Sequence, residues 1–177
     1  MTMKRSLAGA GGALADLAGA IRELAVAVDD CPAGDGDLAV LEALREHAAD
    51  AEGDTAEAAA SAAAALEAEE AGDPSHAVRL AADAHERFSA LSRRIRFGLS
   101  GHGNLFEIER LAVRRGAAWR RWADVVLRQL EQIDDALHRT DAAFVACWQE
   151  VADRRGATVS VAASQIAITQ QRHPSPT

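Results

Sequence analysis

Residues 119–151 read WRRWADVVLRQLEQIDDALHRTDAAFVACWQEV. Large apolar side chains recur there at helical spacing: Trp119, Trp122, Val126, Leu130, Ile133, Leu137, Phe144, Trp148 and Val151. An α-helix has 3.6 residues per turn, so this spacing puts them on one face. Ile108 and Ala112 extend the same line, and we therefore predict one helix from Leu105 to about Arg155, roughly 75 Å long. Gly116 is the weak point of its interior, where a helix is prone to kink or break.

Three further helices are predicted before this one. Residues 6–28 carry a seven-residue apolar repeat, residues 38–71 form an alanine-rich run, and the third helix starts at Pro74. The segment 29–37, DDCPAGDGD, breaks the chain between the first two helices. Gly72, Asp73 and Pro74 supply a stop, an N-cap and a first-turn proline. Within the second run, Gly53 followed by Asp54 and Glu57 indicates a capping box that restarts the helix, which leaves open whether residues 38–71 form one rod or two.

Together these patterns predict an all-α fold, an elongated antiparallel bundle of about four helices with a long last one. Residues 1–156 form a single domain, and residues 157–177 form a short tail. Val159 with Val161, and Ile166 with Ile168, alternate as in an extended segment, while a short helix would use Val159, Ala163 and Ile166. The end of the tail, residues 172–177, is expected to be disordered.

The composition also favours an elongated helical protein. The chain has 177 residues and 42 alanines but only 4 Phe, 3 Trp and no Tyr, so few large side chains are available for a core. No apolar run reaches the roughly 18 residues of a membrane span. Two cysteines far apart fit neither a zinc module nor a disulfide scaffold, which favours a cytoplasmic protein. Abundant Ala, Arg and Gly with a single Lys suggests a GC-rich bacterial genome.

The sequence argues against an enzyme. It contains no G-x-S-x-G, H-E-x-x-H or phosphate-loop motif, and no Glu precedes a His by three residues as in di-iron bundles. We expect no metal, no cofactor and no small-molecule substrate.

Charge is segregated along the chain. Residues 29–73 carry 14 acids and 1 base, whereas residues 74–128 carry 11 bases and 5 acids. Six arginines lie on the third and fourth predicted helices, which an antiparallel hairpin would bring together: Arg93, Arg94, Arg96, Arg110, Arg114 and Arg121. Such a cluster could bind an anion or nucleic acid. A solvated face neutralised by the acidic segment is the alternative, and the net charge of −8 favours it over nucleic-acid binding.

The remaining candidates are the tryptophans and Arg115. Trp119, Trp122 and Trp148 are either the core itself or anchors for a partner. Arg115, one turn before Trp119, either stacks on that ring or awaits a partner's carboxylate. An apolar stripe of about 75 Å exceeds the roughly 37 Å that the third helix can cover, so the first helix, the acidic segment or another subunit must cover the rest. We therefore expect a homo-oligomer or a protein partner, and a non-enzymatic helical protein acting as an adaptor or scaffold.

Overall fold

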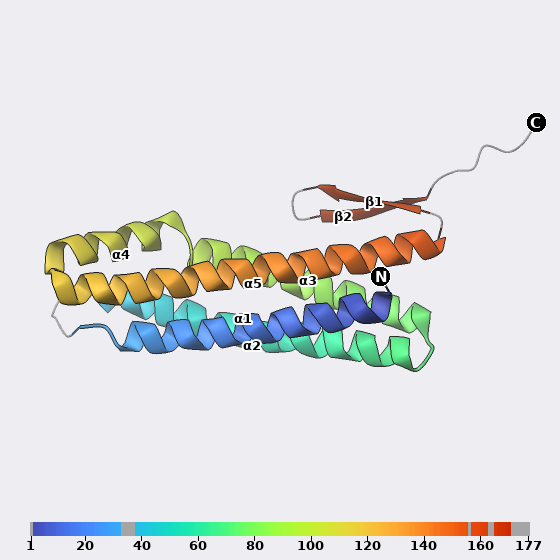
Figure 1. The fold of residues 1–177 in the computed structure, drawn as a ribbon, viewed down its shortest axis with the longest axis horizontal. Helices are drawn as coiled ribbons and strands as arrows, with labels where there is room; N and C mark the ends of the chain where they lie inside the picture. Colours follow the sequence, from blue (N-terminus) through green and yellow to red (C-terminus); the bar gives the residue numbers. More distant parts are fainter. Residues whose placement is uncertain (1, 33–37, 156, 163–164, 171–177) are drawn as a thin grey trace, which may run out of the picture.

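The computed structural model describes residues 2–32, 38–155, 157–162 and 165–170 (Figure 1). Its elements are α1 (Met3–Asp29), α2 (Leu38–Glu70), α3 (Pro74–Gly98), α4 (His102–Arg115), α5 (Ala117–Arg155), β1 (Ala157–Ala162) and β2 (Gln165–Gln170). The predicted elongated antiparallel helical bundle is confirmed. Within these ranges no helix is both long and apolar enough to cross a membrane.

The start of α3 follows its sequence signals. Gly72 has a φ of 79°, the left-handed backbone that ends a helix, and Pro74 occupies the first turn of α3. The Asp73 carboxylate accepts a hydrogen bond of 3.0 Å from the backbone N–H of His76. A side-chain oxygen thus satisfies one of the amides that a helix leaves without a partner at its N-terminus.

The predicted restart of the second helix at Gly53 is wrong, because α2 is one uninterrupted helix. A single glycine costs about 1 kcal/mol in a helix interior, which continuous packing of the alanine-rich face outweighs. Asp54 therefore does not act as an N-cap. Its carboxylate lies 2.7 Å from the Arg94 guanidinium of α3.

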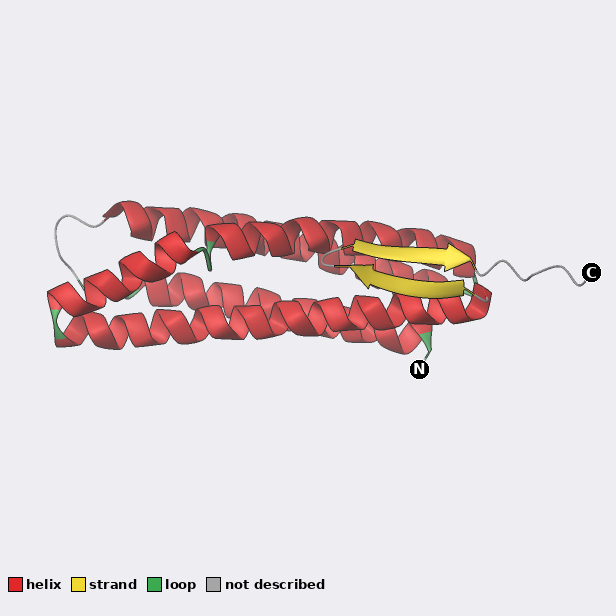
Figure 2. Ribbon diagram, turned by 90° about the horizontal axis from the view of Figure 1, so that it is seen from above, coloured by secondary structure: helices red, strands yellow, loops and turns green. Residues whose placement is uncertain are grey.

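The prediction of one long helix from Leu105 to Arg155 is also wrong. The chain reverses at Gly116, so that α4 folds back on the beginning of α5 (Figures 1 and 2). Gly116 has φ 91° and ψ −161°, a conformation open essentially only to glycine. The apolar periodicity continues across the break because both helices bury the face that carries it, with Ile108 on one side and Trp119 on the other.

We call the interface between two neighbouring helices a seam. Three seams of the bundle are closely packed and the fourth is not. α1 lies between α5 and α2, and α2 packs along α3. Small side chains line the α2–α3 seam: Ala58, Ala62 and Ala65 are buried on α2, and Ala77, Ala81 and Ala84 on α3. α3 and α5 approach each other at few points, and the view in Figure 2 separates their ribbons along much of their length. α3 is the shorter, with 25 residues against 39 in α5, and α4 covers the part of α5 beyond its end.

The tail forms a two-stranded antiparallel hairpin along the C-terminal part of α5 (Figure 1). Val159 pairs with Ile168 and Val161 with Ile166. The extended alternative for this segment is therefore confirmed and the short helix is wrong. The expected disorder of residues 172–177 falls outside the described residues.

Candidate functional site

All three tryptophans lie inside the bundle. Trp119, Trp122 and Trp148 are only 6%, 5% and 7% exposed. The rings of Trp119 and Trp122 meet edge to face with centroids 5.3 Å apart, and the Trp122 indole N–H donates to the Ala27 carbonyl of α1 at 2.8 Å. A partner could not reach these rings in this conformation, so their role here is in the core.

Arg115 lies over the Trp119 ring, with its guanidinium carbon 5.5 Å from the ring centroid. The stacking expected from the sequence is confirmed. The guanidinium is at the surface and covers the edge of a ring that is otherwise buried.

An aromatic ladder separates α3 from α5. Phe88 on α3 contacts Phe144 on α5 (5.7 Å between centroids), Phe144 contacts His85 (5.2 Å), and His85 contacts Trp148 (6.1 Å). The distance between packed helices follows the size of the side chains between them. Rings lie between α3 and α5 whereas alanines lie between α2 and α3, so α3 stands further from α5 than from α2.

The wide seam leaves a recess of about 340 Å³ at the surface. We call this the α3–α5 recess; it is lined by Phe88, Ser89, Ser92, Arg93, Arg96, Phe97 and Asp141. Its floor is the buried Phe88, its α3 rim carries two arginines, and Asp141 stands on the α5 rim. Arg93 forms no ion pair with any described residue, and Arg96 lies at 4.0 Å from Asp134.

The six arginines proposed for anion binding do not form one cluster. Arg94 is paired with Asp54, and Arg110 with Glu107 at 2.5 Å. Arg96 lies beside Asp134, which is 13 residues or about 20 Å further along α5 than Arg121. The early reversal at Gly116 accounts for this separation, because it places Arg114 and Arg121 at the far end of the bundle.

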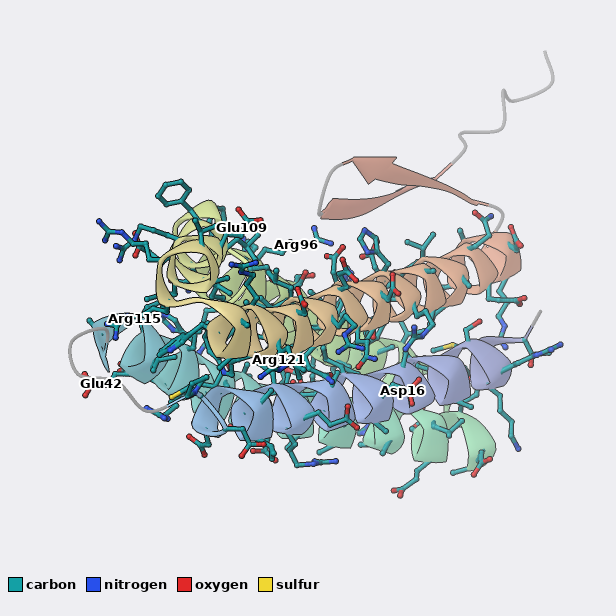
Figure 3. All side chains as sticks on the ribbon, turned by 60° about the vertical axis from the view of Figure 1, so that its left-hand side comes forward. Asp16, Glu42, Arg96, Glu109, Arg115 and Arg121 are labelled. Carbon is teal, nitrogen blue, oxygen red and sulfur yellow. The ribbon has the colours of Figure 1, made fainter. Side chains whose placement is uncertain are left out.

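A different set of arginines lies on the last turn of α4 and the first third of α5. Arg114, Arg120 and Arg121 are exposed and pair with no described carboxylate, and Arg128 bonds only to the backbone oxygen of Asp124. We call these four residues the turn arginines. Acidic residues also occupy this end, because α1 finishes at Asp29 and α2 presents Glu42 nearby (Figure 3).

Three large apolar side chains stand in solvent on the last turn of α3 and along α4. Phe97, Phe106 and Val113 are 83%, 63% and 78% exposed. We call them the elbow surface. Phe106 and Val113 are seven residues apart and so lie on one line of α4, opposite the buried Ile108 and Leu111. These three residues were not among those selected from the sequence. A signal was present, because a large apolar residue that lies off the apolar face of its helix is expected to be exposed.

Two titratable groups, the partly buried His85 of α3 and the buried Cys147 of α5, lie within the bundle. Burial lowers the pKa of His85, and the charge of Asp141 partly opposes this shift. Burial also raises the pKa of the Cys147 thiol to about 12. Both groups are thus held neutral at physiological pH. In the part of the chain that the structure describes, no three His, Cys, Asp or Glu side chains are grouped so as to hold a metal ion.

Comparison with known proteins gives no further assignment, because no family model, curated protein or solved structure matches this chain.

Proposed function

We propose that this chain is a non-enzymatic interaction protein, an adaptor or scaffold of the bacterial cytoplasm, that docks another protein or a second copy through its elbow surface. The observation that carries the proposal is the exposure of Phe97, Phe106 and Val113 in a chain with few large apolar residues. Large apolar groups gathered on the surface are characteristic of protein–protein interfaces. Phenylalanine is among the residues enriched in the buried centres of such interfaces.

The apolar stripe of the last helix gives no support for a partner, because the chain covers it internally. α1 packs along α5, and α4 folds back at Gly116 over the start of α5. The elbow surface is an independent reason, since it faces away from the core that α4 closes.

Site-specific photo-crosslinking tests the proposal. A benzophenone amino acid is placed at position 97, 106 or 113 in separate variants, and at Val26 in a control. Val26 is also exposed (61%) but lies on α1 and not on α3 or α4. We expect defined adducts, either with another protein in bacterial cells or with a second copy, from the elbow positions only. Equal adduct formation from position 26, or none from any elbow position, would contradict the proposal.

Light scattering on a sizing column then separates the two modes of action. A dimer that persists at high salt and is lost on Phe106→Ser, but kept in Val26→Ser, assigns the elbow surface to self-association. A monomer at both salt concentrations assigns it to another protein.

Polyanion binding is the second candidate function. Its support is the set of turn arginines, which have no carboxylate partner among the described residues and could therefore contact phosphates or sulfates.

A further inference from the structure

We propose that the α3–α5 recess binds an amphipathic helix of another protein, whose apolar stripe is flanked by carboxylates. The inference rests on the proposed function and names the chemistry of the partner. A groove between two nearly antiparallel helices is the shape into which a third helix packs through residues spaced i, i+3, i+4 and i+7.

The dimensions of the recess suit a short helix. On α3 the lining of the recess runs from Phe88 to Phe97, a rise of nine residue steps or about 14 Å. This length matches roughly two and a half turns of a docked helix. Phe88 forms an apolar floor, and Phe97 projects at one end, where it can close over an apolar side chain.

The charges on the rim of the recess favour a partner helix that carries carboxylates. Arg93 and Arg96 stand on the α3 side, against one carboxylate, Asp141, on the α5 side. Arg93 has no ion pair with a described residue, and the 4.0 Å between Arg96 and Asp134 is the outer limit of one. Both guanidiniums are therefore able to donate hydrogen bonds to the carboxylate of a partner. Each guanidinium offers two N–H donors to the two oxygens of such a carboxylate.

A second copy of this chain fits the recess less well. Its most exposed apolar helix is α4, whose line of Phe106 and Val113 is bordered by Arg110 and Arg114 as well as by Glu109. That helix would bring arginines towards the rim that already carries Arg93 and Arg96.

Two synthetic helical peptides provide the test. Each is about four turns long with leucines at i, i+3, i+4 and i+7, and the leucines are flanked by Glu in one peptide and by Lys in the other. The net charge of −8 disfavours the Glu peptide at long range, so only local arginines can produce a preference for it. By fluorescence anisotropy at physiological salt, we expect the Glu peptide to bind at least about ten-fold more tightly than the Lys peptide, a difference of about 1.4 kcal/mol.

Variants of the recess locate the binding. Ser92→Trp fills the recess, and Arg93→Glu reverses its exposed unpaired charge; each is expected to weaken Glu-peptide binding at least about ten-fold. Arg5→Glu, which reverses an exposed arginine at the start of α1 outside the recess, should leave Glu-peptide binding unchanged. Circular dichroism checks the fold of each variant, and Arg93→Glu serves alone if Ser92→Trp does not fold.

Four outcomes overturn the inference: no binding of the Glu peptide at millimolar concentration, equal binding of both peptides, binding insensitive to Arg93→Glu, or a dimer that Arg93→Glu dissociates. The last would assign the recess to a second copy. The crosslinking experiment separates the two proposals. Adducts at the elbow positions without peptide binding would reject the recess and keep the interaction function, whereas absence of both would reject both.

Discussion

Trp122 and Ala27 are joined by a buried hydrogen bond in which the indole N–H donates to the backbone carbonyl at 2.8 Å. Ala27 lies in the last turn of α1, where carbonyl groups have no partner within the helix. The bond thus ties the C-terminus of α1 to α5 and satisfies a carbonyl that water cannot easily reach.

Replacing this donor should destabilise the bundle beyond the loss of apolar area. We expect Trp122→Phe to lower the free energy of unfolding by about 2 kcal/mol, because the carbonyl remains buried without a donor. Trp119→Phe is the matched control, since its indole donates no such bond within the described residues. Urea denaturation followed by circular dichroism measures both variants, and equal losses would show that the Ala27 bond contributes nothing.

Gly116 is the position on which the α4–α5 reversal depends. Its backbone, at φ 91° and ψ −161°, is strained for any residue with a side chain. We expect Gly116→Ala to cost about 1 to 3 kcal/mol of unfolding free energy. Gly53→Ala, inside α2 with open space around the added methyl group, should instead gain about 0.5 to 1 kcal/mol. Thermal unfolding compares the two, and a stabilising Gly116→Ala would mean that α4 and α5 can form one continuous helix.

The same glycine shows how far the sequence could lead. Periodicity correctly located the buried face of the last helix, where every large apolar side chain selected between Trp119 and Val151 is buried, because burial of a helical stripe follows from residue spacing. It could not distinguish a continuous helix from a hairpin at Gly116, since Ile108 and Trp119 stay in phase in both. A left-handed glycine depends on what the flanking helices pack against, and spacing does not contain that information.

The α3–α5 recess lay beyond sequence analysis for a related reason. It exists because Phe88, Phe144 and His85 meet on one seam while alanines meet on another. That outcome depends on which helices become neighbours. Arg93 and Arg96 were selected from the sequence, but for a cluster with Arg121 that the reversal at Gly116 prevents.

His85 should make stability depend on pH. Burial lowers the pKa of His85 in the folded state below its unfolded value of about 6.5. Stability is therefore fully present above about pH 6.5 and is lost as the pH falls through the folded-state pKa, because the unfolded chain binds the proton first. His85→Phe retains a ring against Phe144 and should flatten the fall in unfolding free energy between pH 7 and 5. His138→Gln, at an exposed histidine, is the control; a slope unchanged by His85→Phe would contradict the assignment.

The two cysteines should differ in reactivity. Cys147 is buried and its pKa is raised to about 12, so it remains a protonated thiol at pH 8. Cys31 is only partly buried, after the end of α1. With an aromatic disulfide reagent at pH 8 we expect one thiol to react in the native protein and the second only after denaturation. Cys31→Ala should remove the fast phase of the thiol reaction and Cys147→Ala should keep it. Fast reaction of both thiols would show that the packing around Cys147 on α5 opens.

The turn arginines give polyanion binding a defined test. Arg114, Arg120 and Arg121 have no carboxylate partner among the described residues, and Arg128 bonds to the backbone oxygen of Asp124. We expect DNA binding to be weak at physiological salt, because the net charge is −8 and acidic residues share this end of the bundle. Any binding at low salt should fall steeply as salt rises and should weaken in Arg121→Glu but not in Arg93→Glu. Anisotropy of a labelled duplex across a salt series measures this, and tight, salt-resistant binding would favour nucleic-acid recognition over the protein-docking function.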